Sequence, residues 1–338
     1  CRAWPTLVFV DPKGGIMGKH EWEIPYETFD HFLGTIIKQY DAQRLIDRRV
    51  LGYKRESGNE SILSFPGKVL ANDESGHVFI SDSNHNRIIQ ATLDGEILRT
   101  IGGITAGFLD GDFTLASFNH PQGMELDGDV LYVADTENHA IRRIDLSAGY
   151  VDTLVGTGDQ AKFGVVAGTF NDTPLNSPWD LVLHYDVLYI AMAGAHQIWS
   201  LDLGMRTVNT YAGSGRENMS DGSLGSATLA QPSGIDSDGQ RLYFVDSETS
   251  SVRTVDSYPM VGVSTIVGRG LFEFGDVDGR GDDVRLQHPL GVCWSGEILY
   301  VADTYNHKIK RICPTDKSSI TLLGTGLSGY RNGPGDHA

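Results

Sequence analysis

A proline-containing segment recurs five times along the chain at nearly equal intervals. The copies begin at Phe65-Pro66-Gly67, His120-Pro121-Gln122-Gly123, Ser177-Pro178-Trp179-Asp180, Gln231-Pro232-Ser233-Gly234 and His288-Pro289-Leu290-Gly291. The five prolines are 55, 57, 54 and 57 residues apart. Such self-similarity indicates a repeat architecture, in which each unit must stack on its neighbours to bury its apolar faces.

Each repeat carries the pattern of about four short β-strands. An apolar run ends sixteen residues after the first proline and fourteen after each later one, at residues 78–82, 131–135, 188–192, 242–246 and 299–303. These runs are typical of buried inner strands. Another strand opens a few residues later, and each unit closes on a Thr- and Val-rich strand that leads into a glycine pair. Four-stranded units of this length predict the blades of a β-propeller.

Composition supports a mainly β chain and excludes some partners. The 41 glycines among 338 residues suit many short strands joined by tight turns. The net charge of −17, without a dense Lys/Arg cluster, argues against nucleic acid as a partner. Three scattered cysteines form no disulfide framework, which favours a reducing compartment. No apolar stretch is long enough to span a membrane, and we expect no membrane partner.

Long insertions follow several of the glycine pairs and lengthen the repeat. They cover residues 104–117, 159–176 and 271–285. Loops of this length on a rigid scaffold commonly form a binding surface, so we expect them to contribute to one.

The first forty residues follow a different pattern. Residues 7–11 have the composition of a buried strand, Lys13-Gly14-Gly15 indicates a turn, and residues 16–23 return as a second strand. A helix is then predicted, because Phe29, Phe32, Leu33, Ile36, Ile37 and Tyr40 form one apolar stripe. We therefore predict a β-β-α unit at residues 1–41, a linker at 42–63 and the propeller at 64–338.

Two segments carry a family resemblance. Residues 132 to 142, Tyr-Val-Ala-Asp-Thr-Glu-Asn-His-Ala-Ile-Arg, and residues 300 to 310, Tyr-Val-Ala-Asp-Thr-Tyr-Asn-His-Lys-Ile-Lys, resemble the NHL motif. The β-β-α order after Trp4-Pro5-Thr6 resembles the C-terminal half of a thioredoxin-like α/β fold. Together with irregular segments such as 190–199 and 286–292, the arrangement is similar to the family of NHL repeat-containing protein 2 and the suppressor-of-quenching proteins.

The resemblance implies several properties. NHL propellers of this type usually have six blades, so five complete repeats imply either a sixth that is truncated at Ala338, which we prefer, or an unusual closure. Pro5 would be the cis-proline of the thioredoxin-like part. The redox C-x-x-C of that family would lie upstream of Cys1, a lone thiol that cannot perform dithiol exchange. The compartment would be cytoplasmic or, alternatively, an organelle lumen such as the chloroplast thylakoid.

Two sets of residues recur at equivalent repeat positions. The first set is Asp82, Asp135, Asp246 and Asp303, and the second is His139, His196 and His307. The aspartates could form a cation-binding ring, and the histidines could bind zinc. We prefer structural roles, in which an aspartate accepts backbone N–H bonds and a histidine packs or shapes a turn, because residues on a ring are too far apart to share one ion. No metal and no cofactor is therefore expected.

The third repeat departs most from the others. Its distinctive residues are Trp179, Asp180, Met192, His196 and Trp199. They are the candidate binding residues, although the same departure can reflect packing.

The sequence contains no set of residues with support for nucleophilic catalysis. The leading hypothesis is therefore a non-catalytic interaction scaffold that binds a protein partner through its loop face. The alternatives are an accessory domain of a thiol–disulfide oxidoreductase and a metal-dependent propeller hydrolase or lyase.

Overall fold

The computed structural model describes residues 6–21, 26–49, 61–162, 164, 167–256, 262–329 and 331–335. The chain divides into two compact units, Cys1–Glu60 and Ser61–Ala338, and each is described by itself. The predicted mainly β fold is confirmed.

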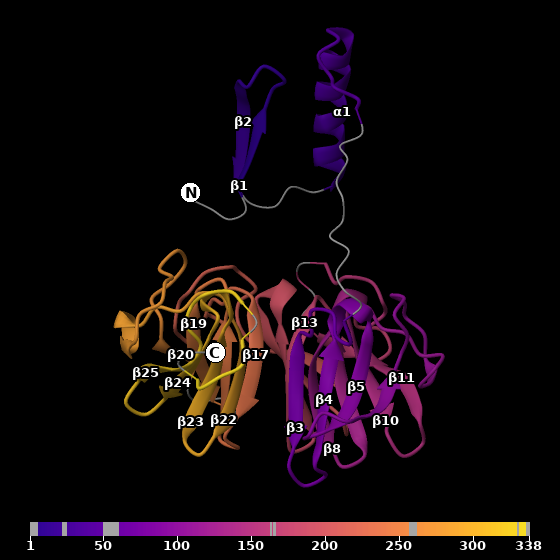
Figure 1. The fold of residues 1–338 in the computed structure, drawn as a ribbon, viewed down its shortest axis with the longest axis vertical. Helices are drawn as coiled ribbons and strands as arrows, with labels where there is room; N and C mark the ends of the chain where they lie inside the picture. Colours follow the sequence, from indigo (N-terminus) through magenta and orange to yellow (C-terminus); the bar gives the residue numbers. More distant parts are fainter. Residues whose placement is uncertain are drawn as a thin grey trace. The chain divides into compact units, whose positions relative to one another are not determined.

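The first unit contains a β-hairpin and one helix (Figure 1). Strand β1 (Thr6–Val10) pairs antiparallel with β2 (Ile16–Glu21), and α1 (Tyr26–Ala42) follows. The Phe9 ring packs edge-on against Phe32 of the helix, at 4.7 Å between ring centroids. The expected β-β-α order is therefore present, whereas its thioredoxin-like identity stays a prediction. Pro5 and Cys1 lie outside the described residues, as do residues 50–60 of the predicted linker.

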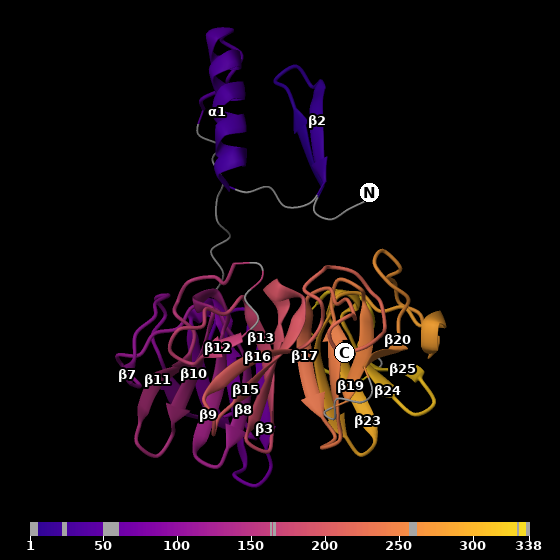
Figure 2. The same cartoon turned by 180° about the vertical axis from the view of Figure 1, so that it is seen from behind.

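The second unit is a β-propeller of five blades, each an antiparallel sheet of four strands in chain order (Figures 1 and 2). The first and second blades comprise β3 (Lys68–Asn72), β4 (His77–Asp82), β5 (Arg87–Thr92) and β6 (Ile97–Ile101), then β8 (Pro121–Asp127), β9 (Val130–Asp135), β10 (Ala140–Asp145) and β11 (Tyr150–Val155). The third comprises β13 (Pro178–His184), β14 (Val187–Met192), β15 (Gln197–Asp202) and β16 (Thr207–Ala212). The fourth and fifth comprise β17 (Pro232–Ser237), β18 (Arg241–Asp246), β19 (Ser251–Asp256) and β20 (Val263–Val267), then β22 (Pro289–Ser295), β23 (Ile298–Asp303), β24 (Lys308–Cys313) and β25 (Ser318–Leu323).

The strand that begins near each repeat proline lies innermost. Contacts between neighbouring blades run from β3 to β8, β13, β17 and β22 in turn. The apolar runs predicted as inner strands are buried, but each is the second strand of its blade. The first run lies farther from its proline because residues 73–76 separate β3 from β4, whereas only Gly128 and Asp129 separate β8 from β9.

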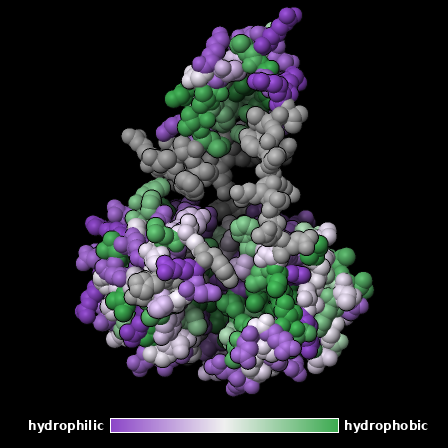
Figure 3. All heavy atoms as spheres, in the orientation of Figure 1, coloured by the Kyte–Doolittle hydropathy of each residue, from purple (hydrophilic) through white to green (hydrophobic). Residues whose placement is uncertain are grey.

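The apolar core lies between blades rather than within them. Four clusters of buried side chains occupy the four contacts between successive blades. In the second and third blades, for example, Ile141 and Leu154 pack with Leu181 and Trp199. The first blade also carries exposed apolar residues such as Val69, and Figure 3 shows apolar side chains gathered there.

The insertions pair with the outer strand of the next blade. Short strands β7 (Gly111–Asp112), β12 (Ala167–Thr169) and β21 (Gly279–Arg280) pair with β11, β16 and β25, and Figure 2 shows β7 beside β11. Each insertion also buries apolar side chains, which include Ala116, Leu175 and Val284. We call these insertions straps. They extend the sheets and seal the core, and their expected contribution to a binding surface stays a prediction.

A buried aspartate fixes the entry into the second blade. Asp135 accepts the backbone N–H of Asn119 at 2.7 Å, and its other oxygen accepts a bond from Arg142 at 3.0 Å. Arg142 reaches outward to Asp110 of the strap, 2.8 Å away. Burial raises the pKa of Asp135 to about 6, although Arg142 opposes the shift. The carboxylate therefore connects strap, entry loop and strand.

The same network recurs in the fourth blade, and the fifth blade has a related arrangement in which a lysine bonds the strap. Asp246 accepts the N–H of Ala230 at 2.8 Å and is 3.0 Å from Arg253, which also bonds Asp221 in the segment between β16 and β17. In the fifth blade Asp303 accepts the N–H of Gln287 at 2.7 Å, and Lys310 bonds Asp278 of the strap. The cation follows the aspartate by seven residues each time.

The third blade replaces this network with apolar groups. Met192 and Trp199 occupy the aspartate and arginine positions, and both are buried. The entry N–H, here from Asn176, meets the Met192 sulfur at 3.4 Å. Replacing a whole buried ion cluster by apolar groups of similar volume is tolerated, whereas removing one partner leaves an unpaired buried charge.

This comparison predicts a non-additive outcome in the fourth blade. Asp246→Met or Arg253→Trp alone should lower the free energy of unfolding by about 3–5 kcal/mol, because each leaves a buried charge without its partner. The double variant should regain at least half of the summed loss. Urea denaturation of the four proteins in the cycle measures the coupling, and additive losses would contradict the interpretation.

Candidate functional site

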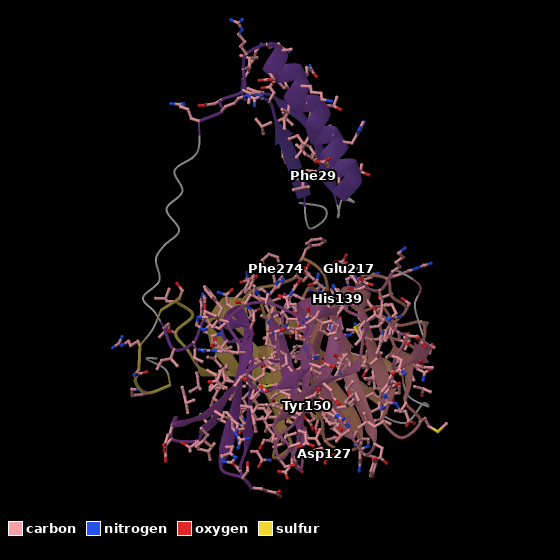
Figure 4. The ribbon with its side chains drawn as sticks, turned by 90° about the vertical axis from the view of Figure 1, so that its right-hand side faces the viewer. Phe29, Asp127, His139, Tyr150, Glu217 and Phe274 are labelled. Carbon is pink, nitrogen blue, oxygen red and sulfur yellow. The ribbon has the colours of Figure 1, made fainter. Side chains whose placement is uncertain are left out.

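The two ends of the propeller differ in what they carry. Loops from the second to the third strand and the straps lie at one end, where Figure 4 shows His139, Glu217 and Phe274. We call it the insertion face. The hairpins between first and second strands lie at the other end, with Asp127 labelled in Figure 4. We call it the hairpin face.

An ion pair crosses the axis between the innermost strands. Lys68 of β3 lies 2.9 Å from the Asp180 carboxylate of β13. The same ammonium donates to the carbonyl oxygens of Ser233 at 2.9 Å and Leu290 at 2.5 Å, in the fourth and fifth blades. All three ammonium protons therefore have acceptors. One lysine connects the first blade to the third, fourth and fifth, and it closes the axis at this level.

Glycines make room for this pair. Lys68 and Asp180 occupy a position that is Gly123, Gly234 or Gly291 in the other blades, as the strand pairing shows. A Cβ atom on Gly123 would lie 2.2 Å from an oxygen of Asp180. Any side chain there would collide with the carboxylate, so the glycine is required for the close approach.

A second group of polar side chains lies two residues farther along the innermost strands of the second, fourth and fifth blades. Glu125 of β8 accepts a backbone hydrogen bond from Leu183, and burial raises its pKa to about 8, with nearby Asp236 and Asp180 adding to the shift. Asp236 accepts the N–H of Trp294 at 2.6 Å. Burial likewise raises the pKa of the Cys293 thiol, which bonds Asp236. These groups favour protonated carboxyl and thiol forms, which suit hydrogen bonding rather than cation binding.

The repeated aspartates are not brought together into a cation site. Asp82, Asp135, Asp246 and Asp303 each bond groups of their own blade, and Asp82 accepts the N–H of Ser64 at 2.6 Å. Among the residues that the structure describes, no group of three or more His, Cys, Asp or Glu side chains could hold a metal ion. This geometry supports the structural role preferred for them.

The repeated histidines connect one blade to the next. His139 and His196 adopt the left-handed conformation at the end of a 3-10 turn, and so does His307. The Nδ1 atom of His139 accepts the N–H of Ser177 at 3.0 Å, in the loop entering the third blade. His196 does the same for Gln231 at 3.2 Å. Asn86 takes this role in the first blade, where it accepts the N–H of His120 at 3.0 Å.

The candidate binding residues of the third blade fall into separate environments. Met192 and Trp199 are buried in the core, with the Trp199 indole N–H donating to Gln197 at 2.9 Å. Asp180 belongs to the axial pair, and Trp179 is half-buried at the start of β13. His196 lines a pocket at the insertion face to which the buried Trp199 also contributes. The structure therefore does not bring these five residues into one site.

Sequence reasoning missed Lys68 and the strap-binding cations. A signal for each was present, because Lys68 is the only cation at a repeat position that otherwise holds Gly or Asp. Arg142, Arg253 and Lys310 share a spacing of seven residues from the repeated aspartate.

Comparison with known proteins gives one family-model match and several long relatives. The NHL repeat model matches residues 118–144. NHL repeat-containing protein 2 of Gallus gallus is 40% identical over an alignment of 358 residues, which covers 96% of this chain and 49% of that protein. The human protein of the same name is 39% identical, with the same two coverages.

Two further similarities have different weight. Protein SUPPRESSOR OF QUENCHING 1, chloroplastic, of Arabidopsis thaliana is 39% identical over 98% of this chain and 33% of its own length. The chain thus spans about half the length of the NHL repeat-containing protein 2 relatives and a third of the Arabidopsis protein. A virginiamycin B lyase from Staphylococcus aureus superimposes with a TM-score of 0.44 at 17% identity, covering 70% of this chain and 62% of the lyase, which is too weak to carry an argument. No helix in the described part of the chain is long and apolar enough to cross a membrane.

The raised pKa of Glu125 predicts that the folded protein loses stability as the pH rises. The folded protein keeps this proton up to about pH 8, whereas the usual carboxyl value is 4.5. The contribution to stability is therefore complete below pH 4.5 and is lost as pH rises toward 8, by about 1.4 kcal/mol per pH unit for one group. Glu125→Gln should remove this slope and be more stable than the parent at pH 8. Denaturant unfolding across this range checks it, with exposed Glu137→Gln as the control.

The hydrogen bond that His139 accepts from Ser177 predicts the opposite pH dependence, a loss of stability as the pH falls. Burial lowers the pKa of His139 from 6.5, so its neutral form is favoured in the folded state. The stability it provides is present above pH 6.5 and is lost as pH falls through the folded-state pKa. His139→Asn, which copies Asn86, should keep the acceptor and reduce the loss of stability between pH 7 and 5. Thermal unfolding at both values tests this, and an unchanged difference between the two would contradict the assigned acceptor role.

Proposed function

The chain is an NHL-repeat β-propeller that belongs with NHL repeat-containing protein 2 and SUPPRESSOR OF QUENCHING 1, and we propose that it is a non-catalytic module that binds a protein partner through its insertion face. NHL-repeat propellers typically act as interaction scaffolds. The observation that carries the proposal is the axial Lys68–Asp180 pair, which occupies the place where the innermost strands converge.

The axial pair bears on the catalytic alternative. A propeller enzyme that uses its axis needs carboxylates available to a cation or a substrate. Here the Asp180 carboxylate accepts from Lys68 and also from the backbone N–H of Ile235 at 3.2 Å. Glu125 retains its proton at neutral pH. These contacts make the axis a packed support. They favour binding of a protein at an end face over hydrolase or lyase activity at the axis.

The insertion face is held rigidly enough to present a surface. Charged networks hold the insertions that precede the second, fourth and fifth blades, and Asn86, His139 and His196 bond the first, second and third blades each to the next one. Exposed apolar side chains lie on this support, including Phe274 and Tyr305, which are 56% and 57% exposed. Rigid aromatic groups of this kind provide contact area at small entropic cost.

The thiol-oxidoreductase hypothesis concerns a longer protein. Cys293 and Cys313 are free thiols in the described propeller. We propose that any dithiol chemistry belongs to residues upstream of Cys1, and that the propeller is then an accessory domain. The proposed compartment is cytoplasmic, with an organelle lumen as the alternative that fits the chloroplastic name of the Arabidopsis relative.

The proposal predicts that partner capture depends on one face. The propeller-containing chain would be immobilised and exposed to an extract of its source organism, with captured proteins identified by mass spectrometry. Phe274→Ala with Tyr305→Ala on the insertion face should reduce capture of specific partners at least tenfold, because both lose exposed aromatic contacts.

The matched control alters the hairpin face. Tyr185 and Met205 lie in hairpin turns and are 84% and 74% exposed. Tyr185→Ala with Met205→Ala should leave capture unchanged. Loss of the same partners through this second pair, or equal capture by all variants, would contradict use of the insertion face.

A further inference from the structure

The third blade lacks a side chain that anchors the strap elsewhere. In the second blade Asn138 donates to the Gly107 carbonyl oxygen at 2.7 Å and to Asp135 at 2.8 Å. In the fifth blade Asn306 donates to the Gly275 carbonyl at 2.6 Å. The equivalent residue of the third blade is Ala195, at the end of η3 (Ala193–Ala195), and it has no amide to donate.

Ala161 is the strap residue that faces this position. Its backbone N–H donates to the carbonyl oxygen of Leu175 at 2.8 Å. In the preceding blade the N–H of Gly107 donates to the carbonyl oxygen of Phe118 at 2.9 Å. Because the two straps share this bond, the Ala161 carbonyl corresponds to the acceptor that Asn138 satisfies in the second blade. Ala195 cannot supply the equivalent bond.

A pocket of about 280 Å³ opens at this place. Its lining combines Ala161, Ala195 and Trp199 with polar groups from three loops, among them His196 and Glu217. Figure 4 shows Glu217 at the insertion face. We call this the third-blade pocket.

The pocket offers the features that recognise a cation. The buried Trp199 forms part of the pocket wall, and Glu217 supplies a carboxylate that can bond a cationic side chain. The strap backbone at Ala161 adds a hydrogen-bond acceptor, and the whole chain carries a net charge of −17. Lys162 also lines the pocket, but it is exposed in the strap.

We propose that the third-blade pocket receives one arginine or lysine side chain of the partner polypeptide, an inference that rests on the proposed function. The incoming N–H groups take the place of the missing asparagine amide. The volume is just below the range of sites for whole small ligands, about 300–1,000 Å³, and therefore suits a single side chain.

The test uses small compounds in place of the partner. Nα-acetyl-arginine amide and Nα-acetyl-lysine amide would be titrated into the full chain, followed by NMR of the tryptophan indole N–H signals. The Trp199 signal is assigned by its absence in Trp199→Phe. The expected result is a saturable shift of this signal by at least one cationic compound, weakened by added salt. The neutral citrulline analogue should bind at least tenfold more weakly.

Ala195→Asn provides the decisive variant. It restores the residue found in the second and fifth blades and should fill the pocket while keeping the fold, as thermal unfolding would verify. Binding of the cationic compounds should fall at least tenfold. Ala148→Asn, the same change at an exposed turn, should bind like the parent.

The outcomes separate this inference from the proposed function. No saturable binding by the parent chain, equal binding of citrulline, or undiminished binding by Ala195→Asn would overturn the pocket assignment. If partner capture still depends on the insertion face in that case, the proposed function stands alone. If the compounds bind as expected but capture does not depend on that face, the proposed function fails and the pocket serves a free cationic ligand instead.

Discussion

Each blade depends on a buried acceptor at the end of its second strand. Asp82, Asp135, Asp246 and Asp303 accept the N–H that precedes the innermost strand, so the start of the first strand is tied to the end of the second. An unpaired N–H in this place would cost about 1–3 kcal/mol. In the second and fourth blades the arginine seven residues later bonds both the aspartate and the neighbouring insertion, and in the fifth blade Lys310 bonds the strap. One carboxylate thus fixes the local chain geometry at the entry to each of these four blades.

In the third blade, apolar side chains maintain the same entry geometry in place of an ion pair. Met192 provides a weak sulfur acceptor, and Trp199 fills the volume of the missing arginine. The change is concerted, because the strap position that holds Asp110 or Asp221 elsewhere is Ala167 here, and the strap-anchoring Asn is Ala195. Substituting only part of the set would leave an unpaired charge. The apolar set also removes the amide that fills the corresponding space in the second blade.

The repeat period and apolar runs were sufficient to predict the number of blades, the number of strands in each and the β-β-α order of the first unit. Contacts between repeats were harder to predict. The pairing of Lys68 with Asp180 joins two distant repeats, and Asp180 has room only because the neighbouring Gly123 carries no side chain. The straps were predicted as loops because their pairing partner lies in the following repeat. For Met192 and Trp199 the sequence left binding and packing open, because periodicity reports spacing and not burial; both are buried.

The axial lysine also has a consequence for how the chain folds. Its three acceptors lie 112, 165 and 222 residues farther along the sequence. Contacts so distant in sequence form after local hairpins, because the entropy of closing the intervening chain must first be offset. Until the fifth blade docks, the ammonium can remain hydrated. Burial of Lys68 would therefore report on completed assembly, and a chain stalled after three blades would hold its first and third blades by a single, solvent-weakened pair.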